Sequence, residues 1–198
     1  MLHDVVVGFK FWKQLRTIDE RIAARVAAGG CPHCGGRLHR GDYARKPRGG
    51  LVAKEAEGEA RRISLCCDRE GCRKRATPPS VRFLGRKVYV GAAIVIACVV
   101  ARRSATAGAA RRALGICGRT VRRWSRWWGS AYATSGDFER ARSQLMPPVG
   151  ARELPGSLWE RFAEHAGDAV EGLARLLGFV APVSTGSVAD GSRFVRGG

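Results

Sequence analysis

Apolar residues recur at spacings of three and four between residues 9 and 28, which is the periodicity of an amphipathic helix. The predicted apolar face consists of Phe11, Leu15, Ile18, Ile22 and Val26, and Trp12 widens it. The glycine pair at 29 and 30 ends this pattern. We therefore expect an N-terminal helix that packs on another part of the chain.

The pattern changes to short alternating runs with frequent glycines between residues 31 and 75. Residues 61–67 are the clearest strand, with Ile63, Leu65 and Cys67 on one face and Ser64 and Cys66 on the other. Residues 54–60 look like a solvated loop between strands. The two prolines within residues 77–80 block a helix and separate this region from the next.

Helical patterns return at residues 87–102, 105–114 and 118–129, and a shorter one covers about residues 137–146 before Pro147-Pro148. Residues 88–101 carry no charge, but a membrane span needs about 20 apolar residues. We expect this segment to be a buried core helix and the protein to have no membrane partner.

A last helix is predicted from Ser157 to about residue 178, opened by a capping box of Ser157 and Glu160. Its apolar face is Leu158, Phe162, Ala166, Val170, Leu173 and Leu177. This face must pack on something, and we expect the N-terminal helix in preference to a second copy of the chain. The oligomeric state stays open.

Together these patterns predict a mainly α fold with a small β zinc ribbon: an N-terminal helix, the ribbon, a three-helix helix-turn-helix domain and C-terminal helices. The expected boundaries are 1–30 for the first helix, 31–80 for the ribbon, 81–130 for the helix-turn-helix domain, 131–183 for a helical extension and 184–198 for a disordered tail.

Charge is distributed unevenly along the chain. The formal net charge is +18, with 35 Lys and Arg against 17 Asp and Glu. No acidic residue occurs from Gly71 to Gly136, although fourteen Lys or Arg fall there. A G+C-rich genome explains Arg in place of Lys, but it does not explain the missing acids. A field of one sign favours a polyanionic partner, because counterions are released when phosphates are neutralised.

Four of the seven cysteines lie in two knuckles, Cys31-Pro32-His33-Cys34 and Cys67 to Cys72. This usage, without the charged-then-apolar order of a signal peptide, indicates metal binding in a reducing cytoplasm. Cys31, Cys34, Cys67 and Cys72 are the predicted Zn²⁺ ligands. Spacing alone also allows Cys66, but Cys67 shares the apolar strand face. We expect His33 to point outward, and His39 is a weaker substitute ligand.

Residues 118–129 carry two opposite stripes on a helical wheel. Arg119, Arg122, Arg123 and Arg126 form a basic stripe, and Val121, Trp124 and Trp128 form an apolar one. Arginine pairs well with guanine and phosphate, so this pattern is typical of a recognition helix. The expected DNA contacts also include Thr120 and, just upstream, Arg111 and Arg112. The alternative is a solvated arginine face, although such faces usually mix charges of both signs.

These motifs resemble the N-terminal module of bacterial insertion-sequence transposases and their small accessory DNA-binding proteins. The matching residues, within about 31–129, are Cys31-Pro32, Cys34-Gly35, Leu114-Gly115-Ile116, Thr120-Val121 and Arg123-Trp124. The resemblance implies a zinc ribbon followed by a helix-turn-helix. Transposases of this kind cut DNA with an acidic triad on a separate RNase H-like domain, and residues 130–198 offer no strand pattern to hold one.

The sequence therefore predicts a non-catalytic, zinc-dependent protein of a mobile genetic element that binds double-stranded DNA, as a transposase accessory or a repressor. It would be cytoplasmic and associated with the nucleoid, and a transposase encoded nearby is a candidate partner. Two alternatives stay open: a truncated transposase or nuclease, and a scaffold that uses the ribbon for protein contacts.

Overall fold

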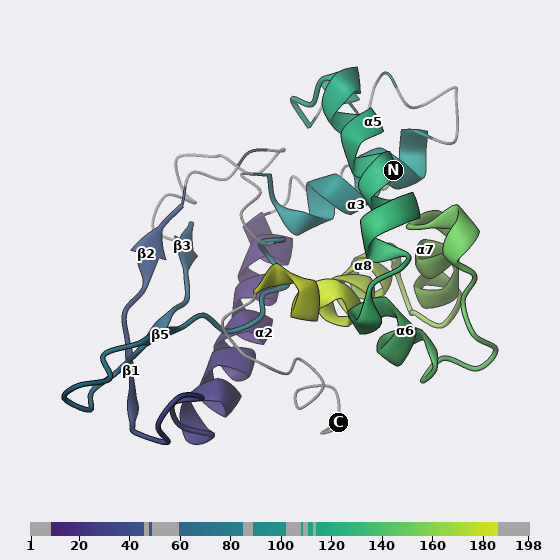
Figure 1. The fold of residues 1–198 in the computed structure, drawn as a ribbon. Coiled ribbons are helices and arrows are strands. Elements are labelled where there is room, and N and C mark those ends of the chain that lie inside the picture. The colour runs from purple at the N-terminus through teal and green to yellow at the C-terminus, as the bar shows by residue number, and fades with distance from the viewer. Residues whose placement is uncertain are drawn as a thin grey trace.

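The computed structural model describes residues 9–45, 48, 60–84, 89–101, 108, 111–112 and 114–185. The described chain is mainly helical, with a small antiparallel sheet to one side of the helices (Figure 1). Its α-helices are α2 (Phe9–Ala28), α3 (Gly91–Ala101), α5 (Gly118–Trp127), α6 (Gly136–Arg142), α7 (Gly156–Glu164) and α8 (Ala169–Val180). This architecture confirms the predicted fold class at the level of a mainly α chain with a small β part.

The strands form two antiparallel groups. β1 (Leu38–Arg40), β4 (Leu65–Cys67) and β5 (Arg75–Ala76) make a three-stranded sheet with β4 in the middle, and β2 (Tyr43–Ala44) pairs with β3 (Arg61–Arg62). The predicted single strand over residues 61–67 is therefore divided. The reason lies at Ser64, whose backbone N–H donates to the Asp42 carboxylate (3.2 Å) while its carbonyl accepts from the Gly41 N–H (2.8 Å).

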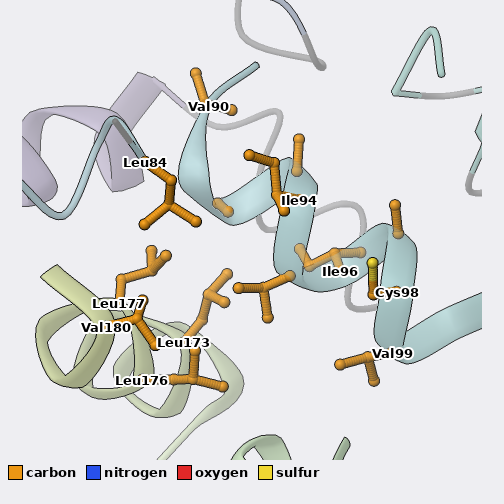
Figure 2. Packing of buried hydrophobic residues seen from close by; sticks show 14 of the residues in the cluster. Leu84, Val90, Ile94, Ile96, Cys98, Val99, Leu173, Leu176, Leu177 and Val180 are labelled. Atoms are coloured by element: carbon orange, nitrogen blue, oxygen red, sulfur yellow. The ribbon is translucent and has the colours of Figure 1, made fainter. Parts of the chain in front are cut away.

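One hydrophobic core extends from α2 to α8, with α3 at its centre. Every residue of α3 from Gly91 to Val100 is buried. Leu173 and Leu177 of α8 point toward α3 and Leu84 in Figure 2. The apolar segment is thus a buried core helix, as predicted, and within the described ranges no helix is long and apolar enough to cross a membrane.

Helix α2 has the predicted bounds and joins two hydrophobic clusters. Phe11, Trp12, Leu15 and Ile22 are buried in the main core, and Ile18 packs against it. Val26, one turn further on, belongs instead to a small cluster around the cysteines. The helix therefore supports both the core and the cysteine-bearing sheet.

The prediction of one C-terminal helix from Ser157 is wrong, because two helices fill that range. The carboxylate of Asp168 caps the N-terminus of α8 by accepting the Glu171 N–H (2.8 Å), which starts a new helix after α7. Ser157 lies inside α7 and does not cap it, since its hydroxyl donates to the Gly150 carbonyl (3.1 Å). The two helices pack on each other and on α3, and α2 joins the same core.

The remaining predicted helices differ mainly at their ends. The segment predicted over 118–129 is α5 followed by a π-helix, Trp128–Tyr132. The helix predicted over 137–146 is α6, which the Ser135 hydroxyl caps by accepting the Phe138 N–H (3.1 Å). Ser184 is buried and belongs to a 3-10 turn, so the predicted disordered tail does not begin at this residue. Residues 54–59 and 186–198, and most of 105–114, lie outside the described residues.

Candidate metal centre and basic helix

Four thiols meet at one end of the three-stranded sheet. The Sγ atoms of Cys31, Cys34, Cys67 and Cys72 all lie within 4.8 Å of one another. Sγ of Cys34 is 3.5 Å from that of Cys67, and Sγ of Cys31 is 3.8 Å from that of Cys72. A disulfide requires about 2.05 Å. Sulfurs bound at about 2.3 Å to a tetrahedral ion are about 3.8 Å apart, so the cluster can hold a metal ion.

Backbone turns and strand register bring the two knuckles together. In the first knuckle, the Gly35 N–H donates to the Cys31 carbonyl and the Cys31 N–H donates to the Gly36 carbonyl, both at 2.8 Å. Gly35 has a φ of 70°, in the left-handed region that glycine adopts without strain. In the sheet, Cys67 of β4 stands opposite Leu38 of β1, which places the second knuckle beside the first.

A side chain at Gly36 would crowd the sulfurs of the cluster. A Cβ at this position would lie 3.0 Å from Sγ of Cys67 and 3.3 Å from Sγ of Cys34. Contacts this short force a neighbour to move. The residue therefore leaves space for the cluster in addition to allowing the chain to turn.

Of the two adjacent cysteines, Cys67 is the one whose thiol lies among the four that could hold a metal ion. Its side chain is buried in the cluster, whereas the Cys66 thiol points away and donates to the Arg73 carbonyl (3.5 Å). Neither histidine joins the four thiols among the described residues. The ring of His39 forms a hydrogen bond with the Asp68 carboxylate (Nε2 to Oδ2, 3.1 Å), and the side chain of His33 is exposed.

The thiols differ in how readily they ionise. Hydrogen bonds from the backbone amides of His33 and Cys34 lower the pKa of Cys31 to about 7, against the opposing effect of its burial. Burial raises the pKa of Cys67 to about 12. A metal ion bound here would have to displace the proton of Cys67. Four thiolates leave a tetrahedral ion no open position, so the arrangement fits a structural role.

Helix α5 presents the two stripes that its sequence predicts. Arg119, Arg122, Arg123 and Arg126 are exposed, while Val121, Trp124 and Trp128 are at most 5% exposed. Within the described ranges none of these four arginines has a carboxylate partner. By contrast, Arg140, Arg142 and Arg175, on α6 and α8, each pair with a carboxylate one turn away.

A tight turn precedes α5 and ends the helical residues before it. The Ile116 N–H donates to the Arg111 carbonyl (2.9 Å), the Gly115 N–H donates to that of Arg112 (3.1 Å), and Gly115 has a φ of 61°. This is a Schellman motif, a common helix end. A shallow pocket of about 310 Å³ lies at the turn, lined by Gly108, Arg111, Arg112, Gly115, Ile116, Cys117 and Gly118.

The predicted DNA contacts thus divide into two groups. Arg111, Arg112, Arg119 and Thr120 surround the N-terminus of α5, and Arg122, Arg123 and Arg126 follow its exposed face. Thr120 is half-buried, with its hydroxyl 3.3 Å from the Cys117 thiol. The cysteine supplies no side-chain cap to the helix.

Arg37, Arg73 and Lys74 lie exposed beside the metal centre, and the sequence patterns above predict no functional role for them. The position of Arg73 and Lys74 directly after Cys72 was a signal for two of them. Arg37 is brought there by strand pairing, which single-sequence periodicity does not reveal.

No family model matches the chain, and neither a curated protein nor a solved structure matches it. The fold and site define it as a mainly helical protein with a four-cysteine centre that can hold a metal ion.

Proposed function

We propose that this chain is a non-catalytic, zinc-dependent DNA-binding protein in which α5 is the recognition helix of a helix-turn-helix. The observation that carries the proposal is the row of four exposed arginines on α5 that have no carboxylate partner in the described part of the chain. Such side chains are free to bind an external anion. Arginines with only a solubility role would resemble those of α6 and α8, which are paired.

Duplex DNA fits this face better than a small anion does. Arginines at positions 119, 122, 123 and 126 follow about two turns of one helix face, and a helix fits the major groove of B-DNA. The buried Val121 and Trp124 hold the opposite face against the core, which keeps the arginines pointing outward. The absence of acidic residues between Gly71 and Gly136 removes local repulsion of phosphates.

We assign zinc to the four thiols because tetrahedral sulfur coordination is the preferred geometry of structural Zn²⁺. The assigned ligands are Cys31, Cys34, Cys67 and Cys72, and the zinc would fasten both knuckles of the ribbon. Metal content per chain, measured on protein purified without added metal, tests this assignment.

The resemblance to insertion-sequence transposase modules supports a role in a mobile element, as an accessory to a nearby transposase or as a repressor. A chromosomal neighbourhood containing a transposase gene would favour the accessory role. A truncated transposase or nuclease is the enzymatic alternative, and cleavage of the bound DNA in the presence of Mg²⁺ would favour it instead.

Selection of bound sequences from random duplex DNA, with zinc-loaded protein, tests the function directly. We expect the selection to enrich one sequence motif. Arg123→Ala should weaken the free energy of binding to this motif by about 1–3 kcal/mol if the side chain pairs with a base. Arg140→Ala is the matched control, because it removes an exposed arginine that is already paired with Asp137. DNA binding that is equal for Arg123→Ala and the wild type at every salt concentration would contradict the proposal.

A further inference from the structure

Three exposed basic residues, Arg37, Arg73 and Lys74, lie beside the end of the sheet that carries the metal centre. The Asp68 N–H donates to the Arg37 carbonyl (3.1 Å), and the Cys67 N–H donates to the Lys74 carbonyl (3.0 Å). Residues 37 and 74 therefore flank the same end of β4 from its two sides. Arg73 lies next to Lys74, and in the described part of the chain none of the three basic side chains has an ion-pair partner.

The left-handed backbone conformation of Arg73 indicates that its side chain has a functional role. Its φ is 43°, in the left-handed region where a residue with a Cβ costs free energy relative to glycine. A glycine would make the same turn with less strain, as Gly71 does at a φ of 81°. Strained positions of this kind cluster at functional sites.

Neutralisation of the metal centre is the competing explanation for these charges. Four thiolates around a divalent ion carry a net charge of about −2. Arg69 already serves the centre, because its guanidinium donates to the Cys34 carbonyl (2.9 Å). Arg73 and Lys74 have exposed side chains with no such anchor, which suits contact with an anion from outside.

This group and α5 belong to different parts of the fold. In Figure 1 the sheet with β1 and β5 lies at the lower left, and α5 lies at the upper right, beyond α3. The two basic groups therefore lie on different parts of the fold. Only a longer duplex can contact both.

We propose that Arg37, Arg73 and Lys74 form a second phosphate-binding surface, occupied when duplex DNA extends beyond the segment covered by α5. This inference rests on the proposed DNA-binding function. It predicts that affinity rises with duplex length up to the point where the knuckle is reached, and that the gain depends on these three residues.

The decisive variant is Arg73→Gly, which removes the charge and relieves the backbone strain together. We expect full zinc content and a melting temperature equal to or above that of the wild type. On a duplex of about three helical turns, DNA affinity should fall. The negative slope of log K against log salt should become shallower by about 0.9, the value for one phosphate contact. On a duplex of about one turn, which only α5 covers, affinity should not change.

Arg140→Ala serves as the control, and Lys74→Ala repeats the measurement at a position with no strained backbone. Wild-type binding of the long duplex by both knuckle variants would overturn the inference, and so would an equal loss on the short duplex. If Arg123→Ala also bound DNA as the wild type does, the proposed function itself would fail. A loss for Arg123→Ala alone would leave that function standing and remove only the second surface.

Discussion

Asp19 and Arg82 form an ion pair inside the core, with the carboxylate Oδ2 2.8 Å from the guanidinium Nε and both side chains 1% exposed. The same carboxylate accepts hydrogen bonds from the Ser80 hydroxyl (2.6 Å) and the Val81 N–H (2.7 Å). The Arg82 guanidinium also lies over the ring of Trp12, 5.4 Å from its centroid. The pair thus fastens α2 to the segment that leads from the metal-bearing sheet into α3.

Removal of this carboxylate should destabilise the whole fold. Asp19→Ala removes the carboxylate that pairs with the buried Arg82 guanidinium, and breaking a buried ion pair costs about 3–5 kcal/mol in the free energy of unfolding. Urea denaturation measures the change. Asp137→Ala is the control, because it breaks an exposed pair with Arg140 that contributes at most about 1 kcal/mol. A similar loss in the two variants would contradict a structural role for the buried pair.

The adjacent cysteines should behave differently when each is replaced. Cys67→Ser should lose the metal and unfold the ribbon, because its Sγ lies among the four thiols and the surrounding hydrophobic cluster is small. Cys66→Ser should keep the metal, since that thiol points toward the Arg73 carbonyl. Metal content of the purified variants decides the matter, and the reverse result would refute the ligand assignment.

Crowding at Gly36 gives a test of the site that leaves every ligand in place. Gly36→Ala puts a Cβ 3.0 Å from Sγ of Cys67, so we expect metal affinity to fall about 10- to 100-fold, as for other changes beside metal ligands. Gly41→Ala is the matched control, at the residue directly after β1, where the nearest atom would be 3.8 Å away. Competition with a chromophoric chelator measures both affinities, and equal values would show that the centre tolerates the extra carbon.

Local periodicity was sufficient to predict the parts of the fold where one face is buried. The bounds of α2 and the two faces of α5 follow from spacings of three and four, because Leu15 and Trp124 are buried where the pattern places them. Strand alternation likewise distinguished Cys67 from Cys66. In each case a residue's neighbours in the sequence determine which way its side chain points.

The features that depend on contacts distant in sequence were not predicted. Arg62 and Arg82 are both 1% exposed, although nothing in their local pattern marks buried charges. Asp19 did carry a signal, since it lies four residues after Leu15 and three before Ile22 on an otherwise apolar helix face. The break between α7 and α8 is a local feature, and it was missed although the spacing of Asp168 and Glu171 matches an N-terminal capping pattern.

The two faces of α5 should separate stability from DNA binding. Trp124 is 1% exposed and its ring meets that of Tyr89 edge-on, with centroids 4.9 Å apart. Trp124→Ala should therefore cost about 3–5 kcal/mol in the free energy of unfolding. Arg123→Ala should leave thermal stability unchanged and weaken DNA binding. If Trp124→Ala had the same melting temperature as the wild type, the face of α5 that carries Trp124 would not be the buried one.

The packing of α8 on α3 predicts that the C-terminal helices are part of the fold. Leu176 is fully buried in the core shown in Figure 2, so Leu176→Ala should destabilise the protein by about 2–5 kcal/mol. Arg175→Ala, one residue earlier, removes an exposed pair with Glu171 and an exposed hydrogen bond to the His165 carbonyl, and should cost about 1 kcal/mol or less. Removal of residues 150–198 should abolish cooperative unfolding, because α3 would lose the apolar cover that α7 and α8 provide. Calorimetry of the shortened chain tests this. A sharp transition near that of the full chain would mean that the core closes without these helices and that they are available to an outside partner.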